Sequence, residues 1–128
     1  MTAEVEARLA AVIVAAGGGT RMGGEVEKQF RLFAGKPVLA HSVEAFLRHP
    51  ATEKVVVVAT ETRMDAAKAA IGDLAGDERV VITAGGNRRQ DSVRAGLELA
   101  ADNIDLVAIH DAARPLLCLL YTSPSPRD

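Results

Sequence analysis

Four short runs of valine, isoleucine and other apolar residues divide the chain, and each shows little alternation between apolar and polar positions. They cover residues 9–16, 54–60, 79–83 and 105–109. Runs without alternation are typical of strands that are buried on both faces, as in a parallel sheet covered by helices. The pattern therefore predicts four inner strands.

Helical spacing fills the segments between these runs. Two sets of residues recur on one helical face each: Leu39, Val43, Phe46 and Leu47, and then Val93, Gly96, Leu97 and Ala100. The alanine-rich segment 61–74 is predicted to be helical too, with its end marked by Gly76 and Asp77. Alternating strands and helices predict an α/β fold in which helices cover both faces of a parallel sheet through right-handed crossovers. Ligands of such sheets bind beyond the carboxyl ends of the strands.

Length and charge limit the classes of protein to consider. With 128 residues, 48% of them hydrophobic, the chain can bury one ordinary core. A formal net charge of -2 gives no field that would gather nucleic acid or an anionic membrane. We therefore expect neither as a partner, and phosphate binding would have to come from locally placed cations.

The single cysteine and the apolar runs indicate a cellular location. Cys118 is the only cysteine, so it cannot form an internal disulfide, which fits a reducing cytoplasm. The apolar run 9–16 is too short to span a bilayer, and no cationic region precedes it as in a signal peptide. We expect a cytoplasmic protein.

A loop of small residues follows the first predicted strand. It contains Ala15, Ala16, Gly17, Gly18 and Gly19, with Arg21 and Lys28 just downstream. Consecutive glycines let a bulky ligand approach exposed backbone N–H groups, and the two cations suit a polyphosphate whose charge shifts during reaction. The loop is interpreted as a phosphate site, and the alternative is a tight turn with two solvated cations.

Two common nucleotide-binding motifs do not match this loop. The Walker motif needs Gly-Lys followed by Ser or Thr, which occurs nowhere in the chain. The dinucleotide fingerprint would place Met22 where its third glycine is required, and no acidic residue ends a second strand about 20 residues further on. The sequence argues against a P-loop NTPase and against NAD binding.

Three motifs in one order carry a specific resemblance over residues 9–117. They are the glycine loop with Lys28-Gln29-Phe30, the segment Gly85-Gly86-Asn87-Arg88-Arg89-Gln90-Asp91-Ser92-Val93, and His110-Asp111-Ala112-Ala113-Arg114-Pro115. Together they resemble the nucleotidyltransferases that activate sugars and sugar alcohols, and within them the 2-C-methyl-D-erythritol 4-phosphate cytidylyltransferase family. One position departs from it, because relatives commonly have proline where Glu27 precedes Lys28.

The resemblance implies a fold and a reaction. The fold is a three-layer Rossmann-like, mostly parallel sheet that is C-terminally truncated here, since relatives continue for about as many residues again. Residues 1–117 would be the N-terminal part of a nucleotidyltransferase domain, and 118–128, rich in Ser and Pro, a disordered or foreign tail. The reaction moves CMP from CTP to a polyol phosphate, uses Mg²⁺ and releases pyrophosphate. The parent protein would be a homodimer.

The resemblance also assigns roles to residues. Arg21 and Lys28 would hold the charge of the reacting phosphates as catalytic residues. The nucleotide would be bound by Ala15, Ala16, Gly17, Gly18, Gly19, Gly85, Gly86, Asn87 and Ser92. Asp111 could touch Mg²⁺, a ribose hydroxyl or the acceptor alcohol, and Arg114 would help hold the acceptor phosphate. From the residues alone, a turn at Gly85-Gly86-Asn87, a helix cap at Ser92 and a strand-end cap or Arg114 ion pair at Asp111 stay open.

Histidine chemistry is not required, because a phosphate nucleophile is already ionised at neutral pH. We expect His41 to pack in a helix, His49 to cap its end and His110 to make a structural hydrogen bond at the strand's exit. Arg88 and Arg89 are expected to be a solvated helix start. Three alternatives remain: a ribitol 5-phosphate cytidylyltransferase, whose relatives tend to have valine at position 113, a nucleotide-binding module without catalysis, and a purely structural domain.

Overall fold

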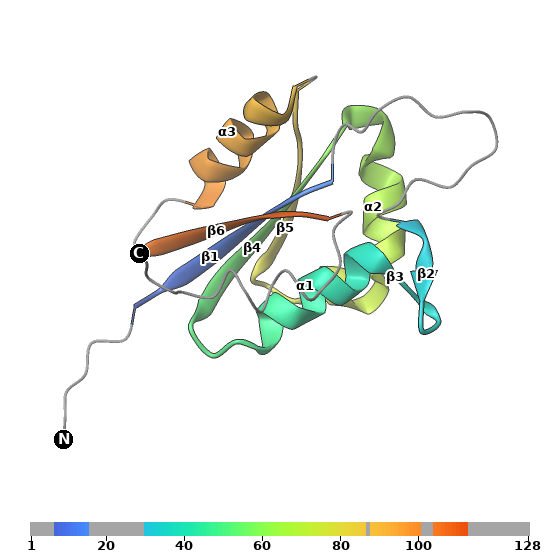
Figure 1. Ribbon diagram of the computed structural model, residues 1–128, viewed down its shortest axis with the longest axis horizontal. Coiled ribbons are helices and arrows are strands. Elements are labelled where there is room, and N and C mark those ends of the chain that lie inside the picture. Colours follow the sequence, from blue (N-terminus) through green and yellow to red (C-terminus); the bar gives the residue numbers. More distant parts are fainter. Residues whose placement is uncertain (1–6, 16–29, 87, 101–103, 113–128) are drawn as a thin grey trace.

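A single four-stranded sheet forms the centre of the molecule. The computed structural model describes residues 7–15, 30–86, 88–100 and 104–112 (Figure 1). The strands are β1 (Leu9–Val14), β4 (Thr52–Ala59), β5 (Val80–Ala84) and β6 (Leu106–Asp111), all parallel, in the order β5-β4-β1-β6. The four predicted strands are confirmed, although β4 begins two residues earlier than predicted and β6 ends two residues later.

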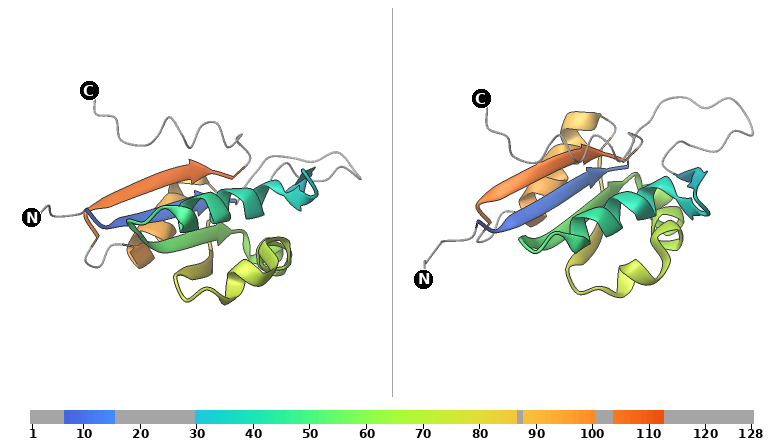
Figure 2. Two further views of the ribbon diagram at one scale, coloured as in Figure 1. Left: turned by 90° about the horizontal axis from the view of Figure 1, so that it is seen from below. Right: turned by 60° about the horizontal axis from the view of Figure 1, so that its bottom comes forward.

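Helices cover both faces of this sheet (Figure 2). Helices α1 (Val38–Arg48) and α2 (Met64–Ile71) pack on one face, and α3 (Arg89–Ala100) packs on the other. The chain first moves outward from β1 through β4 to β5, and it then returns to the far side of β1 for β6. Right-handed crossovers put the helix of the return step on the opposite face. The predicted α/β architecture with a parallel, doubly covered sheet is confirmed.

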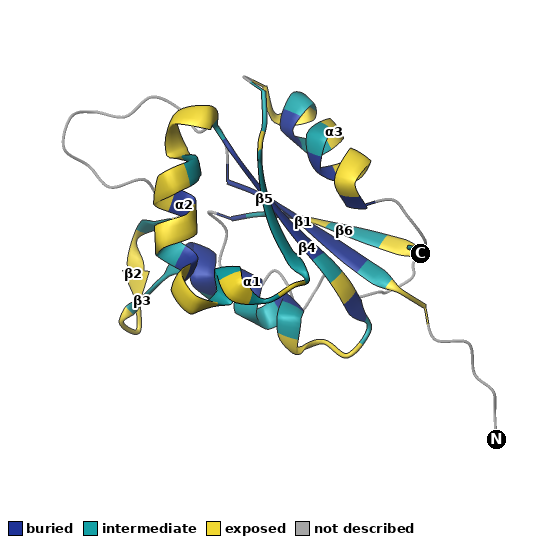
Figure 3. Cartoon of the chain, turned by 180° about the vertical axis from the view of Figure 1, so that it is seen from behind, coloured by how far each residue is buried: buried dark blue, intermediate teal, exposed yellow. Residues whose placement is uncertain are grey.

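The core consists of two apolar clusters separated by the sheet. Ala11 and Ile13 of β1 face α1 and α2, whereas Ala10 and Val12 face α3. Residues 10–13 of β1 and 55–59 of β4 have no exposed surface (Figure 3). Central strands therefore lack alternation because both of their faces are buried.

The predicted stripe of α1 is buried against the sheet, with Leu39 and Val43 fully covered. The predicted helix over 61–74 is instead divided into a 3-10 turn η2 (Glu61–Arg63), α2 and a second 3-10 segment η3 (Gly72–Gly76). Gly72 has a φ of +58°, a conformation that glycine adopts readily and that ends the α-helix three residues before Leu74. Among the helices of the described ranges, none combines the length and the apolarity needed to cross a bilayer.

Helix α3 turns Gly96 and Ala100 to the sheet as predicted, with Ser92 beside them in place of Leu97. Ser92, Gly96 and Ala100 are buried, one helical turn apart, while Leu97 is 36% exposed. A Cβ built on Gly96 would lie 2.4 Å from Val12 Cγ1, so the helix backbone rests directly on β1. The close approach explains why small residues face the sheet and why the prediction for Leu97 was wrong.

A small hairpin precedes α1 and was not predicted. It joins β2 (Leu32–Phe33) to β3 (Lys36–Pro37) through Ala34 and Gly35, whose φ values are +54° and +80°. Two positive φ values are typical of a type I′ turn, but its usual first residue is Asn or Asp rather than alanine. Two-residue strands are too short to produce an alternating pattern, so the sequence carried no signal for them.

Candidate active site

The carboxyl ends of β1, β5 and β6 meet at one edge of the sheet. Three backbone hydrogen bonds continue the strand ladders there: Ala15 N–H to Val58 O (2.7 Å), Gly85 N–H to Ala59 O (2.8 Å) and Ala112 N–H to Val14 O (3.0 Å). Neighbouring strands lie about 4.8 Å apart, so the three spacings from Gly85 to Asp111 cover roughly 14 Å. Ala15 lies between them. One edge thus brings together a residue of each predicted motif, within reach of one nucleotide-sized ligand.

The order of the strands makes this edge a topological switch point. Strand β1 pairs with β4 on one side and with β6 on the other, and Val14 stands opposite Asp111. The connections that leave β1 and β5 run to opposite faces of the sheet, which opens a crevice beyond the strand ends in folds of this kind. Ala15 and Asp111 lie at that position.

Gly85 and Ser92 pack against each other where β5 ends and α3 begins. A Cβ on Gly85 would come within 2.3 Å of Ser92 Oγ and 2.6 Å of Val58 Cγ1. Only glycine fits there, because no L-residue can place its Cβ that close to a neighbour. Ser92 is 1% exposed, and its Oγ has no hydrogen-bond partner among the described residues. A buried hydroxyl without a partner is costly, which is typical of a group that meets a ligand.

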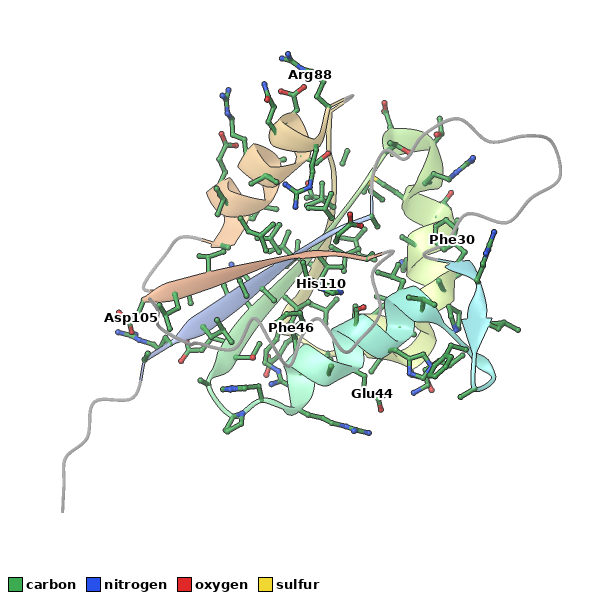
Figure 4. All side chains as sticks on the ribbon, viewed as in Figure 1. Phe30, Glu44, Phe46, Arg88, Asp105 and His110 are labelled. Atoms are coloured by element: carbon green, nitrogen blue, oxygen red, sulfur yellow. The ribbon has the colours of Figure 1, made fainter. Side chains whose placement is uncertain are left out.

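The first turn of α3 carries its charges on the outside. Arg88 Nε lies 3.4 Å from Asp91 Oδ2, and the Arg88 side chain is 71% exposed (Figure 4). Arg89 is exposed as well. Both arginines form the solvated helix start that was predicted. A Cβ on Gly86 would meet Asp91 Cβ at 2.4 Å, so the second glycine of the pair also serves the close approach of this turn.

His110 lies buried at the exit of β6, next to α1 (Figure 4). It is 4% exposed, and its Nε2 lies 3.4 Å from Ser42 Oγ, whose residue is fully buried. Its ring meets the ring of Phe46 edge-on, with the centroids 6.1 Å apart. The structural role predicted for His110 is confirmed. Ser42 was not predicted as a partner of His110, although a serine within an apolar helical stripe is a signal for a buried polar contact.

The other two histidines have the structural roles predicted for them. His41 Nε2 contacts the carbonyl oxygen of Phe33 at 2.6 Å, which ties α1 to the hairpin. His49 is the C-cap of α1, and its Nδ1 accepts a hydrogen bond of 3.1 Å from Ala51 N–H.

Asp111 is the last residue of β6 and is partly buried at the carboxyl edge. Within the described parts of the chain, no three His, Cys, Asp or Glu side chains group as ligands for one metal ion. Mg²⁺ typically takes one or two carboxylates and completes its shell with substrate phosphates and water. A single carboxylate at this edge fits that donor set.

Most of the predicted site residues lie outside the described residues. They are Ala16, Gly17, Gly18, Gly19, Arg21, Lys28, Asn87 and Arg114. The roles of Arg21 and Lys28 as catalytic cations stay predictions, as does the assignment of 118–128 to a tail. Ala15, Gly85, Gly86, Ser92 and Asp111 are placed at the carboxyl edge, and what they bind is likewise a prediction.

The perturbed carboxyl groups of the described residues lie away from this edge. Hydrogen bonds from Arg79 lower the pKa of Asp77 from its usual 3.8 to about 2, and both residues precede β5 at the opposite end of the sheet. A hydrogen bond from Lys36 lowers the pKa of Glu44, which is on α1. Arg79 also donates to the carbonyl oxygen of Leu47 at 3.2 Å. These pairs join elements of the fold and do not serve the candidate site.

The doubly wound parallel sheet, with its switch point at the carboxyl edge, defines an α/β protein of the Rossmann-like class. A family model described as "IspD: 2-C-methyl-D-erythritol 4-phosphate cytidylyltransferase" matches residues 9–121. The chain belongs to this family.

Named relatives agree with the family match. The chain is 50% identical over 109 residues to a bifunctional enzyme IspD/IspF of Rhizorhabdus wittichii, covering 85% of this chain and 27% of that protein. It is 43% identical over 108 residues to a 2-C-methyl-D-erythritol 4-phosphate cytidylyltransferase of Endomicrobium trichonymphae, covering 84% of this chain and 47% of that protein. The chain thus spans less than half the length of these relatives.

A solved structure shows the same fold. It is the 4-diphosphocytidyl-2C-methyl-D-erythritol synthase of Anaerococcus prevotii, which matches with a TM-score of 0.67 at 22% identity. The match covers 91% of this chain and 49% of that structure. At this identity the likeness supports the arrangement of strands and helices.

Proposed function

We propose that this chain is the nucleotide-binding part of an enzyme that transfers CMP from CTP to 2-C-methyl-D-erythritol 4-phosphate. A phosphate oxygen of the acceptor attacks the α-phosphorus of CTP, a new P–O bond forms, and the bond to the leaving pyrophosphate breaks with its electron pair. No proton has to be removed from the nucleophile, because the phosphate is already ionised. Preplaced cations that hold the spreading charge would lower the barrier, and Arg21 and Lys28 are the candidates.

One observation carries the proposal: Ala15, Gly85 and Asp111, which belong to three separate family motifs, meet at the carboxyl edge of the sheet. The strand end at Gly85 would suit a flat base, because this residue has no Cβ and the buried Ser92 hydroxyl packs directly against it. Asp111, about three strands away, would then lie toward the sugar or the phosphates. The spacing matches a nucleotide laid across the strand ends.

We further propose that Mg²⁺ is bound mainly by the phosphates of CTP, with Asp111 as the protein ligand. The ion would neutralise charge on the triphosphate, while Asp111 would fix its place relative to the strand edge. The lone cysteine supports a cytoplasmic location. The parent protein is proposed to be a homodimer, as the resemblance implies.

CTP binding is the first test of this function. A ligand of the native state raises the free energy of unfolding, by about 2.7 kcal/mol at a hundredfold excess over Kd. Thermal unfolding with CTP and Mg²⁺ should show a higher Tm than with ATP and Mg²⁺ at the same concentration. The variant Ser92→Ala, which keeps the small side chain and removes the hydroxyl, should reduce the CTP effect. Equal shifts with CTP and ATP would contradict cytosine recognition.

Turnover is the second test and separates the acceptors. The chain is incubated with CTP, Mg²⁺ and either 2-C-methyl-D-erythritol 4-phosphate or ribitol 5-phosphate, and pyrophosphate is measured. We expect little turnover from this chain alone and preference for the methylerythritol substrate in any that occurs. A preference for ribitol 5-phosphate would favour the alternative enzyme, and CTP binding without pyrophosphate release would fit a binding module.

A further inference from the structure

We infer that Ser42 and His110 are positioning residues that fix the exit of β6 and thereby the place of Asp111. The inference rests on the proposed function in one respect, since it gives Asp111 a ligand to meet. Neither side chain is assigned contact with the ligand. Both act through the strand that carries Asp111.

The contact itself joins α1 to the last turn of the strand. Ser42 Oγ lies 3.4 Å from His110 Nε2, and the two residues are 0% and 4% exposed. One turn further along α1, Phe46 meets the same imidazole edge-on. Helix α1 therefore contacts one ring with a hydroxyl and an aromatic ring, at positions i and i+4 of a single face. In Figure 4, His110 and Phe46 lie together between β6 and α1.

Because residues alternate along β6, the contact between Ser42 and His110 also determines which way Asp111 faces. His110 meets α1, and Ala112, two residues on, is fully buried in the core cluster of the same face. Successive residues of a strand alternate between faces, so Asp111 belongs to the opposite face, on which α3 and Ser92 lie. Fixing His110 and Ala112 on one side therefore turns the carboxylate between them toward the other side.

The hydrogen-bonding atoms explain why these residue types are used. A serine in the middle of an apolar helical face costs free energy unless its hydroxyl finds a partner. Alanine would fill the position without that cost, but it would leave the imidazole without the Ser42 contact. The last bond of the β1–β6 ladder, from Ala112 N–H to Val14 O at 3.0 Å, lies two residues beyond His110 and reports on the order of this exit.

Amide hydrogen exchange of the chain tests the inference without any ligand. In Ser42→Ala, exchange of the Ala112 amide should rise about three- to tenfold, the range expected for the loss of one net hydrogen bond. The Leu9 amide, bonded to Ala51 O at 2.9 Å at the other end of β1, should keep its rate. Thr52→Val is the matched control, because it removes another buried hydroxyl, at the amino end of β4. It should leave Ala112 unchanged.

The histidine is tested by a conservative and a disruptive substitution. His110→Gln can keep an amide near the position of Nε2 and should retain the protection of Ala112, whereas His110→Phe keeps an aromatic ring and should lose it. The same ranking is expected for the affinity of CTP with Mg²⁺ by isothermal titration, with a weakening of about three- to tenfold in Ser42→Ala. In an Asp111→Asn background, Ser42→Ala should cause little further weakening, because the positioned group has been removed.

The outcomes separate the two proposals. If the unsubstituted chain binds no CTP, the proposed function fails, while the exchange rates still decide whether Ser42 orders the β6 exit. If Ser42→Ala and Thr52→Val give the same Ala112 exchange rate, the inference is overturned. It is overturned as well if Ser42→Ala weakens CTP binding by the same factor with and without Asp111, because the effect would then not pass through the carboxylate.

Discussion

The two faces of the sheet are covered in different ways. On the α1 and α2 face, large side chains such as Leu39, Val43 and Phe46 fill the space between helix and strands. On the α3 face, the helix backbone itself rests on β1, because Gly96 leaves no room for a side chain above Val12. On one face, large apolar side chains separate the helices from the strands. On the other face, the helix backbone packs directly on the strand.

The difference indicates what each face is for. Close packing brings the first turn of α3, with Ser92, down to the carboxyl edge beside Gly85. If large side chains separated α3 from β1, the first turn of α3 would lie about one side-chain layer further from the strands. The α1 face has room for side chains, and there it accommodates the buried contact of Ser42 with His110. Close packing thus places the buried Ser92 hydroxyl at the carboxyl edge from one side, and the larger side chains of α1 support the exit of β6 from the other.

The largest effect is expected on the free energy of unfolding when a leucine is truncated to alanine on each face. Leu39 on α1 is fully buried, and Leu39→Ala should lower the free energy of unfolding by about 2–5 kcal/mol. Leu97 on α3 is 36% exposed and belongs to neither core cluster, so Leu97→Ala should leave no closed cavity and cost about 1 kcal/mol. Urea unfolding of the two variants measures both. Equal losses would show that the faces do not differ in this way.

The second effect adds volume to the close face. Gly96→Ala should destabilise the protein by about 1–3 kcal/mol, although alanine is the better helix former, because its Cβ would meet Val12 Cγ1. Gly76→Ala is the control, since nothing lies within 4 Å of a Cβ there and its φ is not positive. A stabilised Gly96→Ala protein would mean that α3 can move away from β1 at no cost.

The third effect concerns the edge that the close face serves. Gly85→Ala would force a Cβ against Ser92 Oγ and Val58, so the Kd for CTP with Mg²⁺ should rise about tenfold or more, which corresponds to about 1.4 kcal/mol. Isothermal titration measures the affinity, and circular dichroism checks that the fold is retained. An unchanged affinity in a folded variant would remove Gly85 from the candidate site.

The smallest effect lies on the α1 side and depends on pH. The pKa of Asp77 is lowered from 3.8 to about 2 by Arg79, so the pair stabilises the native state above pH 3.8. This contribution should be lost as the pH falls from about 4 to 2, when the folded-state carboxylate is protonated. In Asp77→Asn the urea midpoint should be lower at pH 5, and the difference from the unsubstituted protein should shrink toward pH 2. A difference that stayed constant from pH 5 to pH 2 would contradict this contribution of the pair.

The strands and most helices were predictable because burial leaves a direct trace in the sequence. Residues 9–14 of β1 and 55–59 of β4 are apolar at every position because both faces are covered, and the stripe of α1 has the helical period. The division of α2 and the exposure of Leu97 were not predictable, because they depend on one positive φ at Gly72 and on how closely α3 meets the sheet. The order of apolar and polar residues determines neither the φ of Gly72 nor the distance between α3 and the sheet.

The candidate site was predictable in its location and less so in its construction. Motifs that follow predicted strands belong at the carboxyl edge, and Ala15, Gly85 and Asp111 lie there. Gly85 was predicted to bind the nucleotide, whereas its tight packing on Ser92 was not predicted. The partner of His110 is 68 residues away in the chain, and pairs so distant leave no periodic trace in a single sequence.

Helix α1 contacts the hairpin and β6 at neighbouring positions. His41 contacts the carbonyl oxygen of Phe33 in the hairpin, and Ser42, the next residue, contacts His110 in β6. Adjacent residues on a helix are separated by about 100° around its axis and move as one rigid rod. A rotation of α1 that carried the hairpin outward would therefore turn Ser42 away from the imidazole by the same angle. A structural change among residues 32–37 would thus alter the support of His110 and the position of Asp111.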